Sequence, residues 1–270
     1  MSTETSKAQL PLSATLEIFP EKVVSAEKIT ATLLLSATEN KNFSLLLACF
    51  YGPNVKTICK PLRDFRGEKT VEINFFAPSL PNEMERQYTL YTRVYLRDDA
   101  MFSLEIPVME RSELRKREEL GEKIPSFTVS SPFPSFIDLS AKLDRETPII
   151  SENGKSEFDI TMEFRNVESG KIFNPNALSY SPEFPRINDE DMDKAFLSIS
   201  APSVMTIECD RKMVNGKYVL EFFNGDDVIN CHVYISDPSL NSFKIYPFFI
   251  RVYYGYYFDI TGQYTVKGED

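Results

Sequence analysis

The chain has no tryptophan, one histidine and only ten glycines among its 270 residues. A single histidine excludes the helix motif of zinc proteases, which needs two, so a serine or cysteine triad would have to be built around His232. The adjacent Cys231 would point to the opposite face of a strand and could not act with it. The few glycines form neither a Walker loop nor a dinucleotide fingerprint. These absences predict a protein without catalytic residues and without a cofactor.

Long hydrophobic runs and an excess of basic charge are also missing. No window holds about 18 uninterrupted apolar residues, and the start MSTETSKAQLPLS lacks the apolar segment and cleavage site of a signal peptide. We therefore expect no membrane span, and synthesis in the cytoplasm with incorporation into a virion or another assembly. The net charge of −10 repels phosphate backbones. The expected partners are other protein subunits, self or hetero, and not nucleic acid.

Aromatic residues, in contrast, are concentrated near the C-terminus. Eight of the thirteen residues of YPFFIRVYYGYYF (246–258) are aromatic, and the run alternates with a period of two. One apolar face of the predicted strand holds Phe248, Ile250, Val252, Tyr254, Tyr256, Phe258 and Ile260. The opposite face carries Phe249, Tyr253 and Tyr257. Because a bare aromatic row favours aggregation, we expect another domain, subunit or loop to cover these three rings.

Strands with the same alternation fill the first part of the chain. Seven segments are found between Leu12 and Val108, which is the number that an immunoglobulin-like sandwich needs. They are residues 12–18, 27–36, 43–51, 55–60, 69–76, 87–97 and 101–108. We therefore predict an immunoglobulin-like domain at 10–108, preceded by a polar tail at 1–9.

Residues 109–125 (MERSELRKREELGEKIP) interrupt the strand pattern with five acids and five bases. Opposite charges lie four residues apart, as for Glu113 and Arg117, which favours a short exposed helix. Gly121 and Pro125 would end it. We predict a charged linker here, with a hinge or docking helix as the alternative.

The remainder, 126–270, is predicted to be a larger β-sandwich. Its strands are expected at 136–143, 157–165, 195–200, 204–209, 217–223, 228–235, 243–260 and 263–267. Asn215-Gly216 and Asn224-Gly225 are typical of two-residue hairpin turns. Residues 166–194 have no strand period and form a loop insertion, which is where binding surfaces tend to be placed on a sandwich. The overall fold class is all-β, with two tandem immunoglobulin-like antiparallel sandwiches.

Three segments of the second block resemble archaeal immunoglobulin-like β-sandwich modules. They are FRNVESGKIFNP (164–175), GKYVLEFFNGDDVINCHVYISDP (216–238) and FFIRVYYGYYFDITGQYTVKG (248–268). Such modules have a turn between Asn and Gly after an early strand, a strand with a cysteine, and a late Tyr-x-Tyr, here Tyr254 and Tyr256. The resemblance covers about residues 130–268 and implies a fold and an archaeal origin, without implying an activity. Many relatives are exported and anchored, whereas this chain lacks the signal and the anchor.

The acidic segment INDEDMDKAF offers a candidate calcium site. Asp189, Asp191 and Asp193 supply hard oxygen ligands at alternating positions. Lys194 stands where an EF-hand loop needs glycine, and Ser200 stands where it needs glutamate. The alternative is a solvated acidic loop.

The four cysteines form two candidate pairs. Cys49 and Cys59 flank a turn symmetrically and would lie opposite one another on a hairpin, where they could bond or pack as free thiols. Cys209 and Cys231 could also bond, but not if 204–209, 217–223 and 228–235 form one meander, since the middle strand would separate them. Only a crossing between sheets would bring this second pair together.

The sequence as a whole predicts a non-enzymatic structural or adaptor subunit of a larger assembly, such as a virion, a filament or a surface complex. The first alternative is a module that binds carbohydrate or calcium through the 166–194 insertion. The second is an unrecognised hydrolase, which would need carboxylates converging in a cleft.

Overall fold

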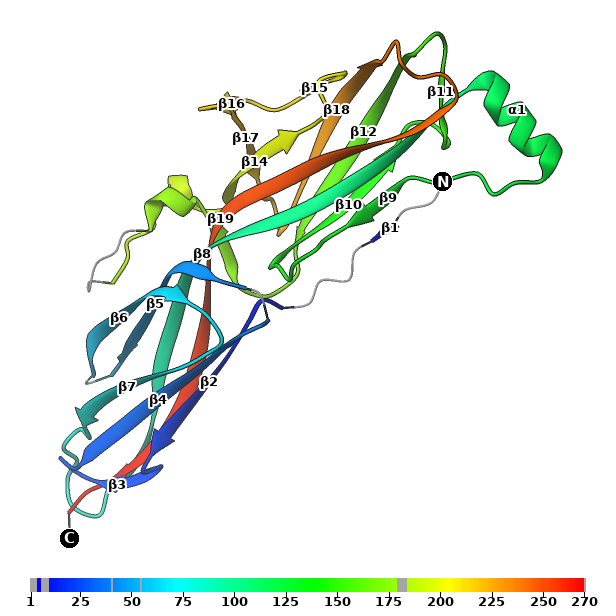
Figure 1. Cartoon of the computed structure of the whole chain (residues 1–270). Helices are drawn as coiled ribbons and strands as arrows, with labels where there is room; N and C mark the ends of the chain where they lie inside the picture. Colours follow the sequence, from blue (N-terminus) through cyan, green and yellow to red (C-terminus); the bar gives the residue numbers. More distant parts are fainter. Residues whose placement is uncertain (1–3, 6–9, 40, 54, 179–183, 270) are drawn as a thin grey trace. The chain divides into compact units, whose positions relative to one another are not determined.

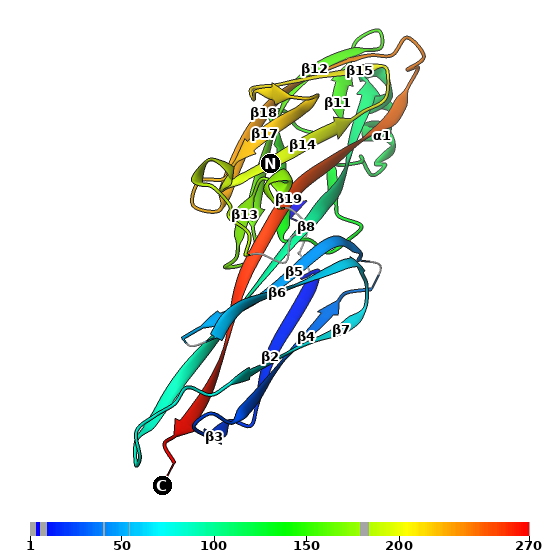
Figure 2. The ribbon, with the colours of Figure 1, turned by 90° about the vertical axis from the view of Figure 1, so that its left-hand side faces the viewer.

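The computed structural model describes residues 4–5, 10–39, 41–53, 55–178 and 184–269. The chain is mostly β, and most of its strands pair in antiparallel sheets (Figures 1 and 2). Among the described residues, one α-helix is present, α1 (Arg111–Leu120), together with two short 3-10 turns. None of the described helices has the length and apolar composition that crossing a membrane requires.

The chain divides into two compact units, and neither is a continuous stretch of sequence. The first unit contains residues 1–9, 99–168 and 193–253, and the second contains 10–98, 169–192 and 254–270. These units do not coincide with the predicted ranges 10–108 and 126–270. The difference arises because the last strand of the chain contributes to the unit that holds the N-terminal strands, a long-range contact that local alternation does not encode.

The second unit contains most of the strands predicted from the first part of the sequence. β2, β4 and β7 form an antiparallel sheet in that order, while β5 pairs with β6 and with the start of β8. The strands that lie wholly in this unit are β2 (Leu12–Phe19), β3 (Lys22–Val24), β4 (Lys28–Ala37), β5 (Phe43–Gly52), β6 (Val55–Phe65), β7 (Glu68–Phe76) and β13 (Lys171–Phe173).

The first unit holds a five-stranded sheet in the order β1-β10-β12-β18-β15 and part of a second sheet with β16, β17, β14, β19 and β8. Two sheets with alternating buried residues in each unit are consistent with β-sandwiches. The strands that lie wholly in this unit are β1 (Glu4–Thr5), β9 (Thr128–Ser130), β10 (Ile137–Leu143), β11 (Ile149–Ser151), β12 (Lys155–Asn166), β14 (Lys194–Ser200), β15 (Met205–Cys209), β16 (Met213–Val214), β17 (Lys217–Glu221) and β18 (Asp226–Ser236).

Two strands are much longer than predicted. β8 (Glu85–Glu110) runs through the expected break between 97 and 101, and β19 (Phe243–Lys267) runs through the break between 260 and 263. Each passes from one unit into the other, at Asp98 and at Tyr253 respectively. In β8 the charged residues Asp98 and Asp99 are compatible with a strand because Asp98 pairs with Lys41 and Asp99 pairs with Arg251.

The alternation predicted for the aromatic C-terminal run is confirmed along most of its length. Phe248, Ile250, Val252, Tyr254 and Tyr256 are each at most 1% exposed. Phe258 and Ile260, which we expected on the same face, are only half-buried. The even-numbered side chains of the run therefore belong to the hydrophobic core as far as Tyr256, as a two-residue period requires.

The predicted helix is also confirmed. Glu113 and Arg117 form the expected ion pair across one turn, at 2.8 Å. Gly121 ends α1 in the left-handed conformation (φ 66°), which glycine adopts without steric cost. No residue of α1 is buried, and the whole predicted linker 109–125 lies within the first unit.

Candidate functional site

A groove of about 540 Å³ opens on a sheet face of the first unit. We call it the Phe249 groove. Its lining comes from β8, β14, β19 and the end of β9 with the two residues that follow it, and consists of Met101, Phe102, Ser103, Ser130, Ser131, Pro132, Ser198, Ser200, Phe249, Ile250 and Arg251. The Phe249 side chain is 57% exposed, although its strand neighbours Phe248 and Ile250 are buried. The groove therefore presents an aromatic ring that the unit itself does not cover.

Strand register brings these side chains together. Ser200 lies opposite Phe249 and Ser198 lies opposite Arg251 where β14 pairs with β19. Residues directly opposite on antiparallel strands share one face of the sheet, so both serines accompany the ring. Ser103 lies opposite Ser130 in the same way where β8 pairs with β9. The result is an aromatic side chain among small hydroxyl side chains.

The one charged side chain of the groove is neutralised locally. Arg251 Nε donates to Asp99 Oδ2 at 2.7 Å, and this hydrogen bond raises the pKa of Arg251 above its usual value. The residues that line the groove include no histidine, cysteine or carboxylate. Its serine hydroxyls thus have no general base among the lining residues. The groove can therefore make apolar contacts through the Phe249 ring and hydrogen bonds through the serine hydroxyls around it.

The three rings of the outer face of β19 have different surroundings. Phe249 is exposed, whereas the Tyr253 ring lies 3.7 Å from Lys217 Nζ and 4.7 Å from the guanidinium carbon of Arg251. Tyr257 is half-buried, and the guanidinium carbon of Arg93 lies 4.4 Å from the centre of its ring. Cation–π contacts therefore partly cover two of the rings. Only Phe249 keeps most of its surface accessible.

The described part of the 166–194 insertion covers Tyr257 within the second unit. Phe173 and Leu178 are fully buried in a cluster with Tyr95. Gly255 permits this packing, because a Cβ atom there would come within 2.3 Å of the Phe173 ring. Burial raises the pKa of Tyr95 to about 12. Residues 179–183 of the insertion lie outside the described residues.

The insertion therefore uses its apolar side chains to cover a sheet, and this does not favour the carbohydrate-binding alternative.

The positions of the acidic residues of the insertion do not favour the calcium-binding alternative. Asp191 Oδ1 accepts a hydrogen bond from Asn174 Nδ2 at 2.7 Å, and Asp191 lies in the 3-10 turn η2 (Asp189–Asp191). In the described part of the chain, no three His, Cys, Asp or Glu side chains gather closely enough to hold a metal ion. Asp189, Asp191 and Asp193 alternate in sequence but do not converge in space.

Both cysteine pairs are joined as disulfides. Cys49 lies opposite Cys59 on β5 and β6, and Cys209 lies opposite Cys231 on β15 and β18. The meander that would have separated the second pair does not form. β17 leaves the sheet to pair with β14, so β15 becomes the direct neighbour of β18.

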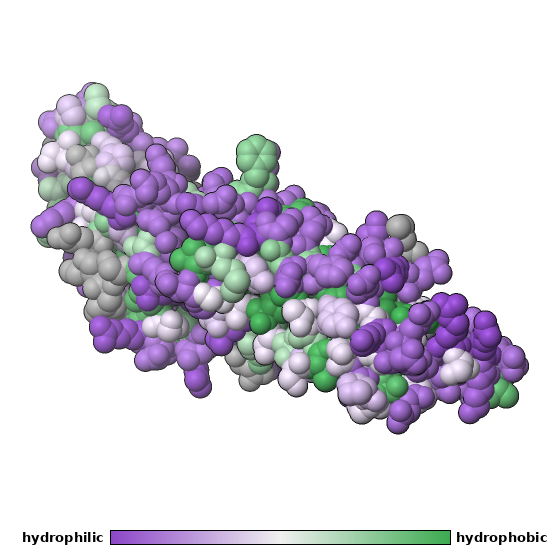
Figure 3. Space-filling view, turned by 90° about the horizontal axis from the view of Figure 1, so that it is seen from above, coloured by the Kyte–Doolittle hydropathy of each residue, from purple (hydrophilic) through white to green (hydrophobic). Residues whose placement is uncertain are grey.

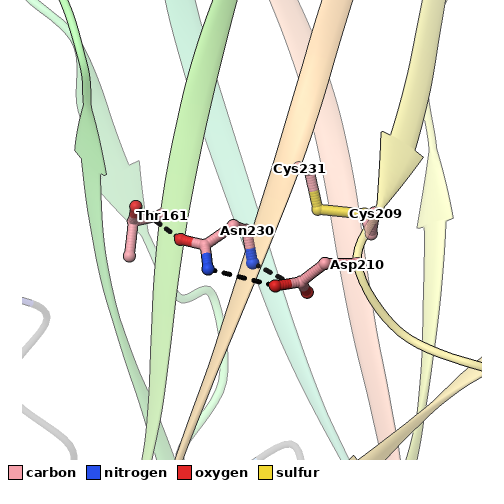
Figure 4. Close-up of a disulfide and its surroundings, with 5 residues drawn as sticks. All are labelled: Thr161, Cys209, Asp210, Asn230 and Cys231. Atoms are coloured by element: carbon pink, nitrogen blue, oxygen red, sulfur yellow. Dashed lines mark hydrogen bonds between the residues drawn. A yellow bond between two sulfur atoms is a disulfide. The ribbon is translucent and has the colours of Figure 1, made fainter.

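Side-chain hydrogen bonds reinforce the strands beside this second disulfide (Figure 4). Asp210 accepts from the backbone amide and from the side-chain amide of Asn230, both at 3.1 Å, and Asn230 Oδ1 accepts from Thr161 at 2.9 Å. This row ties the strands on either side of β18 to it.

The single histidine is not placed for nucleophilic catalysis. His232 is exposed on β18, and its Nδ1 lies 2.8 Å from Asp159 Oδ1, which raises the pKa of the imidazole. Its neighbour Cys231 is buried and bonded to Cys209. The two side chains point to opposite faces of the strand, as the sequence predicted.

Sequence reasoning identified Phe249 but not the residues around it. The segment KAFLSIS alternates buried Leu197 with Ser198 and Ser200, so the outward direction of the serines could have been predicted. Their place beside Phe249 depends on the pairing of β14 with β19, and no local signal predicts that pairing. Figure 3 shows one face of the molecule, where hydrophobic residues appear in separate patches among hydrophilic ones.

No family model matches the chain, and no curated protein matches it. A similar solved structure is Escherichia coli alpha-2-macroglobulin activated by porcine elastase, with 7% sequence identity and a TM-score of 0.21. The alignment covers 96% of this chain and 33% of that one, so the chain spans about a third of its length. A TM-score of this size does not show a shared fold.

Proposed function

We propose that the protein is a non-enzymatic structural or adaptor subunit of a larger assembly, such as a virion, a filament or a surface complex. The observation that carries this proposal is the Phe249 groove. Burying a phenylalanine side chain stabilises a contact by roughly 1.5–3 kcal/mol. An exposed ring beside an apolar hollow therefore supplies a driving force for association, while the serines around it can hydrogen-bond to a partner at the rim.

The occupant that we propose for the groove is a second copy of this chain. The same patch carries a protruding ring and a hollow, so a two-fold contact places each Phe249 in the groove of the other copy. The net charge of −10 on each chain opposes this association by electrostatic repulsion. Salt screens that repulsion, so the association should strengthen as the salt concentration rises.

The fold proposed for both units is immunoglobulin-like. Two sheets of mostly antiparallel strands in each unit, strands of alternating burial and the late Tyr254 and Tyr256 support it. The proposed relationship is to archaeal immunoglobulin-like sandwich modules, which the three segments described above resemble.

Light scattering after size-exclusion chromatography tests the proposal. The wild-type chain should form a dimer or larger species as protein and salt concentrations rise, and Phe249→Ser should remain monomeric. The matched control is Phe223→Ser, because Phe223 is 81% exposed in the same unit but does not line the groove. A wild-type chain that stays monomeric under all these conditions, or equal effects of the two substitutions, would contradict docking by a second copy.

A further inference from the structure

A lysine and an aspartate are buried together in the second unit. Lys41, which precedes β5, is 7% exposed, and its Nζ lies 2.5 Å from Oδ1 of Asp98, whose side chain is 1% exposed. The hydroxyl of the fully buried Tyr254 donates to the other carboxylate oxygen at 2.7 Å. We call Lys41, Asp98 and Tyr254 the Lys41 cluster.

Aromatic side chains lie on one side of this cluster. Lys41 Nζ lies 5.9 Å from the centre of the Phe43 ring, and Phe43 stacks on Phe65. Both rings are at most 4% exposed. Removing two charges from water is costly, and their attraction does not always offset that cost. A reaction that eliminates both charges while keeping the hydrogen bond of Tyr254 would relieve this cost.

We propose that Lys41 and Asp98 condense to form an intramolecular amide bond. The ammonium of Lys41 first gives a proton to the carboxylate of Asp98, which leaves a neutral amine and a carboxylic acid. The amine lone pair then attacks Cγ and forms the Nζ–Cγ bond. The Cγ–Oδ1 bond breaks, and Oδ1 leaves as water after receiving a second proton from Nζ. No oxidant, reductant or further reactant is needed.

The geometry favours this step in two ways. The amine and the carboxyl group are held together by the fold, so the entropy of bringing them together is already lost on folding. The hydroxyl of Tyr254 is aimed at Oδ2, where negative charge develops when Cγ becomes tetrahedral, and a fixed donor at that place stabilises the intermediate. Exclusion of water from the cluster opposes hydrolysis of the product.

The first unit contains an internal comparison, which we call the Lys244 cluster. Lys244 Nζ lies 2.8 Å from Asp237 Oδ2, and the hydroxyl of Tyr246 donates to the same oxygen at 2.7 Å. The Lys244 side chain is 50% exposed. Water reaches the Lys244 side chain, so this pair lacks the enclosure that we invoke for condensation and should remain an ion pair.

The intact mass of the full chain tests the proposal after reduction and alkylation of the cysteines. The wild-type chain should be lighter by one water molecule than its sequence requires. A tryptic digest should contain a branched species in which residues 29–56 are joined to residues 98–111 through Lys41 and Asp98. Lys41→Met should have the full mass, whereas Lys244→Met should still lack one water.

The wild-type chain alone can overturn the proposal, so failure of a variant to fold does not prevent the test. A full intact mass, a linear peptide that ends at Lys41, or a water loss located at another residue would each contradict the amide bond. This outcome is independent of the proposed assembly function, which is read from the oligomeric state.

Discussion

The Lys41 cluster and the Lys244 cluster contain the same three side-chain types, one cluster in each compact unit, and differ mainly in how much water reaches the lysine. In both, a tyrosine hydroxyl donates to the aspartate at 2.7 Å. The lysine side chain is 7% exposed in one and 50% exposed in the other. Both aspartates are buried, so the contrast lies in the lysine, and on our proposal only the pair whose lysine is also enclosed condenses.

The largest expected effect comes from removing the lysine of each cluster. Lys41→Met removes the proposed amide and leaves the Asp98 carboxylate buried without a cation, and an uncompensated buried charge costs about 3–5 kcal/mol of the free energy of unfolding. Lys244→Met should cost less, because Asp237, although buried, still accepts hydrogen bonds from Ser239 and Tyr246. Urea unfolding at neutral pH measures both. Equal losses for the two variants would show that the contrast in burial has no energetic consequence.

The disulfides extend the comparison, since each unit has one between directly opposite strands. They close loops with sequence separations of 22 for Cys209 and Cys231 and of 10 for Cys49 and Cys59. In the chain-entropy model both contribute about 3 kcal/mol, with slightly more for the wider loop. Replacing either pair by alanine should therefore lower the urea midpoint by a similar amount. If reduction of both disulfides in the wild-type chain leaves the urea midpoint unchanged, the disulfides do not stabilise the fold and this prediction is wrong.

A smaller effect on the free energy of unfolding should appear at acidic pH, and it should come from Asp237 in the Lys244 cluster. Hydrogen bonds from Lys244, Ser239 and Tyr246 hold the pKa of Asp237 well below its usual range. A lowered pKa in the folded state adds stability above the unfolded-state pKa, about 3.9, and this contribution is lost as the pH falls further. The difference in unfolding free energy between wild type and Asp237→Asn should therefore shrink below about pH 4. A difference that does not change with pH would contradict this assignment.

Much of the secondary structure could be predicted because alternation is a property of neighbouring residues. The strands β2, β4, β5, β7, β10, β12 and β18 lie close to their predicted ranges, and α1 ends at the predicted Gly121. The facing positions of Cys49 and Cys59 also follow from local spacing, since one hairpin carries both.

The sequence left other features open because they depend on which strands are neighbours. Whether Cys209 could reach Cys231 depended on β17, which had to leave the sheet before β15 could pair with β18. The Phe249 groove needed β14 beside β19, and the cover over Tyr257 needed the insertion to fold back onto a sheet.

The amino-acid sequence by itself determined that this chain forms strands, which face of the C-terminal run is apolar, and that the charged helix ends at Gly121. Only the tertiary structure decided that Lys41 is enclosed while Lys244 is half in water, and that Phe249 is left uncovered. The reason is physical: a two-residue period is set by adjacent side chains, whereas access of water to a side chain is set by residues that are distant along the chain.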